Sequence, residues 1–308
     1  MDPTLFLNNT SSGLCSPAII SSLICLLIGT LASVTLCGNL LVIISIVYFK
    51  QLQTPTNTLV LSLAVADLLV GAVVLPFSLV IATNSCSQIE YLLCVIRGAF
   101  DITLCASSIL SLCSISIDRY LAVCQPLRYK NIVTFNVSLI MIVVVWTVSS
   151  VCGIVMTVTW KAEGECSIMK GFKTAVIASF LSFCTPVIIM VILYAKIFYV
   201  AWKQVKNINC IHVGKGVGKM ERKATRTLMI VMGVFIICWT PFVLLITAMP
   251  FVEIDEPSIV LGFKWLGWSN SMLNPFIYAV FYSWFRSAFK LILNGKIFKG
   301  DFTNAKLV

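Results

Sequence analysis

The sequence predicts an all-α membrane protein: a bundle of seven transmembrane helices followed by a short amphipathic helix. Of its 308 residues, 59% are hydrophobic and only 11% are charged, and the mean hydropathy is +1.00. In a soluble domain about a quarter of the residues are charged. Seven runs are apolar and long enough to cross a hydrocarbon core of about 30 Å as helices. They lie at about residues 18–48, 57–82, 91–123, 136–160, 171–202, 225–250 and 258–282. We therefore divide the chain into an N-terminal tail (1–17), the bundle (18–282), and an amphipathic helix with a short tail (283–308).

Basic residues are distributed unequally between the two ends of these helices. With the N-terminus outside, 17 of the 22 Lys and Arg residues lie on or near the cytoplasmic side. The positive-inside rule then favours an extracellular N-terminus, and an odd number of spans places the C-terminus inside. Asn8 and Asn9, which each begin an N-glycosylation sequon, are then extracellular. The net charge of +10 reflects this topology and attraction to anionic membrane lipid. Because the charge is divided among loops, it does not indicate nucleic-acid binding.

Four cysteines fall on the predicted outer side, which is an oxidising compartment. We expect a disulfide between Cys94 in the third run and Cys166 in the loop before the fifth. The sequence leaves open whether Cys15 and Cys86 pair with each other or stay free. The only histidine, His212, has no second ligand nearby, so a histidine or cysteine metal site is not indicated.

The second and third runs contain carboxylates at membrane depth. An ionisable residue there is costly and usually faces the bundle interior, so Asp67 and Asp101 are candidate functional residues. The alternative for Asp67 is an internal hydrogen-bonding role that ties Asn39 to a neighbouring helix, and the two roles are compatible with each other. Asp101, Cys105 and Ser108 follow i, i+4, i+7 spacing and share one helix face.

Two alternatives accompany Asp101. It can receive a ligand, or it can pair with an intramembrane cation, for which Arg97 and Lys264 are the candidates. At the other end of the same run lies the triplet Asp118-Arg119-Tyr120. A helix that carries charge near both membrane faces is suited to transmitting a signal between them.

The last three runs contain prolines that permit kinks. In the fifth run, Ser179 and Ser182 precede Pro186 and can either donate to a ligand or bond back to the helix backbone. The sixth begins near Glu221 and contains the segment Cys238-Trp239-Thr240-Pro241-Phe242. In the seventh, the residues Lys264, Trp268, Ser271, Pro275 and Tyr278 follow steps of 4, 3, 4 and 3 and so share one face.

Taken in order, these motifs resemble those of the rhodopsin-like (class A) G-protein-coupled receptors. The shared marks, one on each helix, are Gly38-Asn39, Leu63-Ala64-Val65-Ala66-Asp67, Asp118-Arg119-Tyr120, Trp146, Pro186 with Tyr194, Cys238-Trp239-Thr240-Pro241 and Asn274-Pro275-Phe276-Ile277-Tyr278. The pattern Asn270-Ser271-x-x-Asn274-Pro275-x-x-Tyr278-x-x-x-Tyr282-x-Trp284-Phe285 is similar to the fingerprint of the trace amine-associated receptors.

The resemblance implies a plasma-membrane receptor for a small protonated amine that acts through a heterotrimeric G protein. Most relatives are olfactory receptors for volatile amines and use a stimulatory G protein that raises cyclic AMP. A serotonin- or histamine-like receptor is the alternative within the class. A transporter is a further alternative, although the chain lacks related halves. An enzyme is not expected, because no nucleophile–base pair is evident.

The same resemblance assigns roles to individual residues. The expected ligand-binding set is Asp101, Cys105, Ser179, Ser182, Trp239, Phe242, Lys264 and Trp268. Of these, Lys264 and Trp268 are included for their position opposite Asp101 and not because of the resemblance. The activation switch is formed by Asp118, Arg119, Tyr120, Tyr194, Glu221, Pro241, Asn274, Pro275 and Tyr278, with Arg119 held by Asp118 and Glu221. A resting-state sodium ion, with no other cofactor, is held by Asp67, Ser108, Asn270, Ser271 and Asn274, since hard cations prefer oxygen ligands.

Two residues depart from the aminergic pattern. Trp268 stands where relatives usually carry tyrosine, which we expect to deprive Asp101 of a hydroxyl partner. Lys264 adds a cation near the mouth of the predicted pocket. It either disfavours a second ligand ammonium, so that monoamines bind better than diamines, or snorkels with its head group in water.

Overall fold

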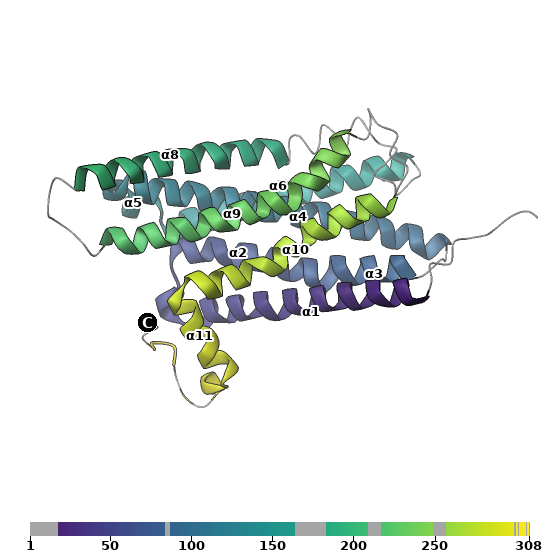
Figure 1. Ribbon diagram of the computed structural model, residues 1–308, viewed down its shortest axis with the longest axis horizontal. Coiled ribbons are helices and arrows are strands. Elements are labelled where there is room, and N and C mark those ends of the chain that lie inside the picture. The colour runs from purple at the N-terminus through teal and green to yellow at the C-terminus, as the bar shows by residue number, and fades with distance from the viewer. Residues whose placement is uncertain are drawn as a thin grey trace, which may run out of the picture.

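The structure is an elongated bundle of helices aligned along one axis (Figure 1). This computed structural model describes residues 18–83, 87–163, 183–208, 217–248, 257–298, 300, 302–305 and 307. The helices within them are α1 (Ala18–Tyr48), α2 (Pro55–Leu69), α3 (Leu75–Thr83), α4 (Ser87–Cys124), α5 (Pro126–Ile132), α6 (Phe135–Glu163), α8 (Thr185–Ile208), α9 (Val217–Ala248), α10 (Pro257–Phe281) and α11 (Ser283–Leu293). A π-helical segment, η2 (Val70–Val74), joins α2 to α3, and short 3-10 turns occur at η1 (Lys50–Leu52) and η4 (Lys296–Phe298).

The predicted fold class is confirmed. Within the described residues, five helical stretches are long and apolar enough to cross a membrane: Ser22–Tyr48, Pro55–Val80, Leu92–Cys124, Phe135–Thr159 and Met229–Ala248. The shorter apolar stretch Thr185–Val200 lies in α8, and Ile259–Phe281 of α10 bends by 106° into α11. The seven predicted runs therefore correspond to α1, α2 with α3, α4, α6, α8, α9 and α10.

Helix boundaries differ from the predicted runs where a helix continues outside the apolar region. The second run was expected to begin at residue 57, but α2 begins at Pro55, because the Thr54 hydroxyl caps its first turn by accepting from Asn57 N. The helix α9 begins at Val217, before the expected start near Glu221 and before the apolar run at about residue 225, so it includes basic residues that precede the run. Hydropathy locates where a helix enters lipid and not where its hydrogen bonding ends. The short helix α5 was not predicted at all.

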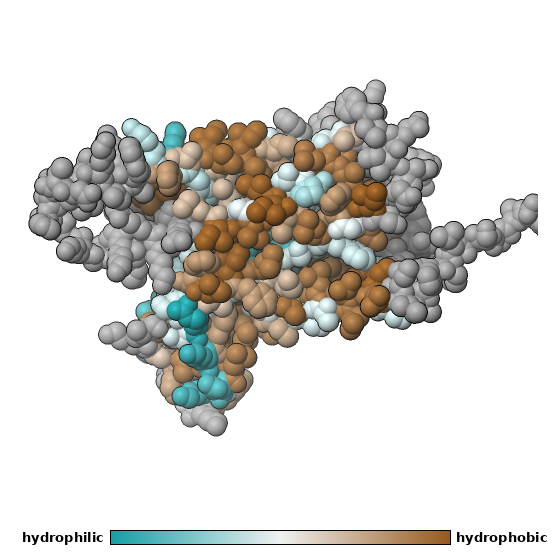
Figure 2. Space-filling view, viewed as in Figure 1, coloured by the Kyte–Doolittle hydropathy of each residue, from teal (hydrophilic) through white to brown (hydrophobic). Residues whose placement is uncertain are grey.

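An apolar surface surrounds the bundle. Figure 2 shows hydrophobic residues gathered over the long helices and a hydrophilic strip along α11. On α6, the large side chains of Ile140, Val143 and Ile154 are exposed. In the described stretches, 67% of the apolar part of α4 is buried inside the bundle, compared with 17% of α6. The helix α4 is thus central, which places its polar side chains among the other helices.

The end of the chain folds back onto the connection between α1 and α2. Leu307 is buried with Phe49, Leu52 and Ala288 in a small apolar cluster. Backbone contacts reinforce it: Lys50 N donates to Thr303 O at 3.0 Å, and Leu307 N donates to Gln51 Oε1 at 2.9 Å. This cluster lies at the end of the bundle where α11 leaves α10 (Figure 1).

Candidate functional site: a buried ion pair and two polar clusters

The Asp101 carboxylate, on α4, is buried and fully engaged by α10. Lys264 Nζ lies 2.5 Å from Asp101 Oδ2, and Trp268 Nε1 donates to Asp101 Oδ1 at 2.7 Å. Only 4% of Asp101, 6% of Lys264 and 1% of Trp268 is exposed. One turn of α10 separates Lys264 from Trp268, so both side chains reach the same point on α4. Of the two roles considered for Asp101, the structure contains the intramembrane ion pair, and its partner is Lys264.

Aromatic rings surround the Lys264 ammonium. Its Nζ lies 5.9 Å from the centre of the Phe242 ring and 5.4 Å from the centre of the Trp268 ring, within the range of a cation–π contact. Phe242 in turn makes an edge contact with Trp239 at 6.0 Å between ring centres. The carboxylate and the rings expected to hold a ligand ammonium therefore hold an ammonium that belongs to the chain.

The structure adds detail to two expectations at this site. Trp268 provides no hydroxyl, as expected, but its indole N–H donates to the Asp101 carboxylate instead. Lys264 does not snorkel, because its head group is buried against Asp101 rather than placed in water. A snorkelling lysine keeps its ammonium in water. Here the Asp101 carboxylate on the facing helix α4 takes the place of that water.

The other predicted ligand-binding residues are placed as follows. Cys105 is a free, partly buried cysteine one turn along α4 from Asp101. Trp239 is 8% exposed and packs against Gly267 of α10, where a Cβ atom would lie 2.9 Å from Trp239 Cε3. Glycine is therefore required for this close approach. Ser179 and Ser182 lie outside the described residues.

A second polar cluster surrounds Asp67, which is fully buried. Asp67 Oδ1 accepts hydrogen bonds from Ser108 Oγ at 3.1 Å and Ser271 Oγ at 2.8 Å, and Oδ2 accepts from Asn274 Nδ2 at 2.8 Å. Asn39 Nδ2 donates to Ser271 O at 3.0 Å. Three helices, α2, α4 and α10, thus meet at this carboxylate, and α1 joins the cluster through the bond from Asn39 to Ser271, so a structural role for Asp67 is present in the bundle.

The donor set of the Asp67 cluster fits a sodium ion. Every side-chain atom available to an ion is an oxygen, and the Oδ1 atoms of Asn270 and Asn274 are buried without a hydrogen-bond partner among the described contacts. Asn270 is not among the residues that hydrogen-bond to Asp67 within the described part of the chain, although it is only 1% exposed and neighbours Ser271. A hard cation bound through oxygens would use atoms that the protein leaves unsatisfied.

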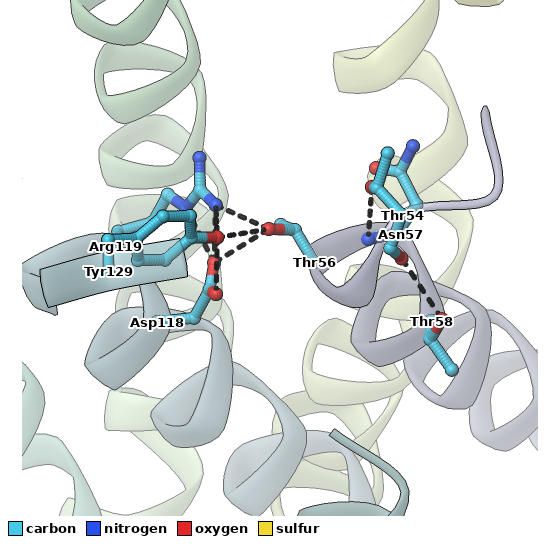
Figure 3. Close-up of polar contacts among 7 residues, drawn as sticks. All are labelled: Thr54, Thr56, Asn57, Thr58, Asp118, Arg119 and Tyr129. Atoms are coloured by element: carbon cyan, nitrogen blue, oxygen red, sulfur yellow. Dashed lines mark hydrogen bonds and ion pairs between the residues drawn. The ribbon is translucent and has the colours of Figure 1, made fainter. Parts of the chain in front are cut away.

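Near the C-terminal end of α4, Arg119 is held in a closed network (Figure 3). Arg119 Nε donates to Asp118 Oδ2 at 2.8 Å, and Arg119 also donates to Thr56 Oγ1 and to Tyr129 OH. Tyr129 OH donates to Asp118 Oδ1 at 2.9 Å, and Thr56 Oγ1 donates to Asp118 Oδ2 at 2.9 Å. The side chains come from three helices: Thr56 from α2, Asp118 and Arg119 from α4, and Tyr129 from α5.

Two members of this network, Thr56 and Tyr129, were missed by the sequence reasoning. One signal was available: Pro126 suits the first position of a helix, and a helix from Pro126 places Tyr129 in its first turn beside Asp118. Burial, followed by the neighbouring Asp118 carboxylate, raises the pKa of the Tyr129 phenol, so the phenol stays protonated and able to donate. Nothing in the sequence pairs Thr56 with Arg119, because the two are 63 residues apart.

The remaining predicted switch residues lie on α4, α8, α9 and α10. Tyr194 is buried on α8, Tyr120 is partly buried on α4, and Tyr278 on α10 stacks on Phe285 of α11 at 5.6 Å between ring centres. Pro241 and Pro275 lie inside α9 and α10. The backbone of Glu221 is part of α9, but its side chain lies outside the described residues, so its expected contact with Arg119 stays a prediction.

Outer-surface predictions fall mostly in undescribed parts of the chain. Cys94 is disulfide-bonded, while its expected partner Cys166 lies outside the described residues. The glycosylation candidates Asn8 and Asn9 also lie outside them.

Comparison with known proteins agrees with this geometry. Residues 38–278 match the family described as 7 transmembrane receptor (rhodopsin family). The chain is 38% identical to trace amine-associated receptor 4 of Mus musculus over 312 residues, which cover 94% of this chain and 90% of that protein. It is 40% identical to trace amine-associated receptor 1 of Mus musculus over 89% of both chains. It is 39% identical to trace amine-associated receptor 1 of Homo sapiens, over 89% of this chain and 88% of that one.

Proposed function

The chain belongs to the rhodopsin family of seven-transmembrane receptors, within the trace amine-associated group, and we propose that its Asp101 carboxylate binds the ammonium of a small amine. Membership makes the protein a multi-pass membrane receptor, and not an enzyme, with a small-molecule ligand and a G protein as partners. Our proposal adds the plasma membrane as its location, an extracellular N-terminus, and coupling to the stimulatory G protein that raises cyclic AMP.

One observation carries the ligand assignment: the site already accommodates an alkylammonium group. The Lys264 ammonium contacts Asp101 and lies beside the Phe242 and Trp268 rings. A ligand ammonium can use the same carboxylate and rings, because both interactions depend on charge and not on the identity of the cation. Ser179 and Ser182 are proposed to meet polar groups at the far end of the ligand.

The closed cytoplasmic network supports the proposed switch. Arg119 is bound to Asp118, Thr56 and Tyr129, and we propose that this is the resting arrangement, which a G protein must open to reach Arg119. Ligand contact near Trp239 is proposed to move α9 about Pro241 and release the network. The Asp67 cluster is proposed to hold sodium in the resting state and so to favour the closed form.

A cyclic AMP panel tests the proposed function. Cells that express the wild type, Asp101→Ala or Asp101→Asn are exposed to primary and tertiary amines, with serotonin and histamine included for the alternative receptor classes. We expect amine responses in the wild type that are abolished in both variants, with surface amounts matched by labelling an N-terminal tag. An amine response that survives undiminished in Asp101→Ala would contradict the assignment.

A further inference from the structure

The ammonium-binding position of this receptor is occupied by its own lysine, and that constrains which ligands can enter. From the Asp101–Lys264 contact at 2.5 Å we infer that the pair is a two-charge site selecting a zwitterionic ligand, with an ammonium and an acidic group, over a simple monoamine. The inference rests on the proposed function, because it assumes that Asp101 receives the ligand ammonium.

A monoamine that displaces Lys264 creates an uncompensated charge. Asp101 then faces the ligand ammonium, and the Lys264 ammonium remains nearby. Lys264 is only 6% exposed, so water does little to stabilise its charge. Among the described residues, Asp101 is the only carboxylate within ion-pair distance of Lys264. Two cations and one anion therefore share a poorly hydrated site, which is unfavourable.

A zwitterion removes this difficulty. Its ammonium takes Asp101 Oδ2 and its acidic group takes Lys264, so each charged side chain exchanges one partner for another and the net charge of the site stays at zero. Trp268 Nε1 holds Asp101 Oδ1 at 2.7 Å, so the carboxylate is kept in position while its other oxygen changes partner. A cation alone or an acid alone completes only half of this exchange.

The geometry also limits the spacing of the two ligand charges. Because Asp101 Oδ2 and Lys264 Nζ are in contact before the ligand enters, a ligand that inserts between them needs its ammonium and acid only a few bonds apart. An α- or β-amino acid meets this requirement. Its apolar remainder can pack against Phe242, which already lies beside the Lys264 ammonium.

Two matched series of probes test the inference. The first is 2-phenylethylamine, phenylalanine and 3-phenylpropionate. They share a carbon skeleton and carry, in that order, the ammonium alone, both charges, and the acid alone. The second is propylamine, 3-aminopropanoate and propanoate. Half-maximal concentrations are measured by cyclic AMP in cells, and ligand-induced rises in melting temperature are measured on the purified full-length receptor.

In the wild type, at least one series should show the zwitterion more potent than its monoamine by about tenfold or more. Lys264→Met should reverse that order, because it frees Asp101 for a monoamine and removes the cation that holds the acid. Lys264→Arg should keep the zwitterion preference. A wild type that prefers monoamines, with a ratio unchanged in Lys264→Met, would overturn the inference.

Two further outcomes also count against it. If the wild type responds to neither series and Lys264→Met responds only to monoamines, Lys264 blocks the site and does not bind an acid. If neither the wild type nor Lys264→Met responds to any compound of the two series, the zwitterionic ligand class is also rejected. Failure of the proposed function gives a different result, because cyclic AMP responses would then be the same in the wild type and in the Asp101 variants. The charge-swapped double variant, Asp101→Lys with Lys264→Asp, controls for folding because it retains an ion pair.

Discussion

Trp268 determines how the Asp101 carboxylate is presented. An indole N–H can donate but cannot accept, so it fixes Asp101 Oδ1 and leaves Oδ2 as the oxygen open to exchange. Both oxygens are satisfied at a site where 1% of Trp268 and 4% of Asp101 is exposed. Burying an ion pair is costly, and removing one partner of such a pair typically destabilises a protein by about 3–5 kcal/mol.

Trp268→Phe tests the indole donor. It keeps an aromatic ring beside Lys264 but leaves Asp101 Oδ1 without its hydrogen bond, which should cost about 1–3 kcal/mol. We expect a lower melting temperature for the purified receptor, and Trp268→Tyr should recover part of the loss because its hydroxyl can donate. Equal melting temperatures for the wild type and Trp268→Phe would show that the hydrogen bond contributes nothing.

Asp67→Asn tests the proposed sodium site. The substitution removes the negative charge that an ion needs but preserves the size of a side chain that contacts Ser108, Ser271 and Asn274. Sodium should raise the melting temperature of the wild type above that in potassium, and this difference should vanish in Asp67→Asn. Asp101→Asn is the control, since it removes a buried carboxylate elsewhere and should keep the sodium effect. A sodium effect retained in Asp67→Asn would place the ion at another site.

At the scale of helices, α9 packs tightly on α10 where Trp239 meets Gly267. The ring of Trp239 also lies 6.3 Å from Phe235 and 6.0 Å from Phe242 between centres. The aromatic column on α9 is thus held against a position of α10 that has no side chain. A change in this contact should be transmitted to Pro241, two residues further along α9.

Gly267→Ala is predicted to disturb this contact. Its Cβ would lie 2.9 Å from Trp239 Cε3, and overpacking of this kind typically costs about 1–3 kcal/mol. We expect a lower melting temperature and a higher basal cyclic AMP level, because Trp239 must leave its resting position. Gly262→Ala on the same helix is the matched control, since its Cβ would meet nothing within 4 Å. Identical behaviour of the two variants would argue against the contact.

The contact between α5 and α4 gives a second prediction at this scale. Tyr129→Phe removes the donor to Asp118 Oδ1 and the acceptor for Arg119, so the resting network should loosen and basal cyclic AMP should rise. Tyr199→Phe, on an exposed side chain of α8, is the control and should leave the basal level unchanged. A basal level that falls or stays constant in Tyr129→Phe would mean that α5 does not hold the resting state.

For the whole molecule, the segment that ends at Leu307 packs against the turn that follows α1. Leu307 is 5% exposed within the cluster that includes Phe49, Leu52 and Ala288. The side-chain amide of Gln51 donates to Leu307 O through Nε2 and accepts from Leu307 N through Oε1. The tail therefore connects α11 to the turn that follows α1, and we expect it to contribute to the stability of the receptor.

Leu307→Ala tests this connection. The substitution removes apolar contacts from the cluster, so the melting temperature should fall by a few degrees while amine potency stays the same, because the ligand site is at the other half of the bundle. Phe298→Ala is the control, since Phe298 is 87% exposed. A melting temperature that is unaffected by Leu307→Ala would mean that the tail is only loosely attached.

Much of the architecture could be predicted from the sequence because the bilayer acts on each segment separately. The apolar runs revealed the spanning helices, and the cost of a charge at membrane depth identified Asp67 and Asp101 before any partner was known. Helix ends were less predictable, as at α9, because a helix continues into water without a change of hydrogen bonding. The helix α5 was missed because it is short and has no apolar run.

The sequence by itself determined the fold class, the family and most of the chemically important side chains, because these follow from local hydropathy and motifs, though it did not identify Thr56 and Tyr129. Only the tertiary structure decided the partners of those side chains. Asp101 and Trp268 are 167 residues apart, and the choice between a ligand carboxylate and an internal ion pair depended on whether α10 presents Lys264 to α4. Contacts between distant segments depend on how the helices pack. The Asp101–Lys264 ion pair, on which the proposed ligand class rests, could therefore be established only from the folded bundle.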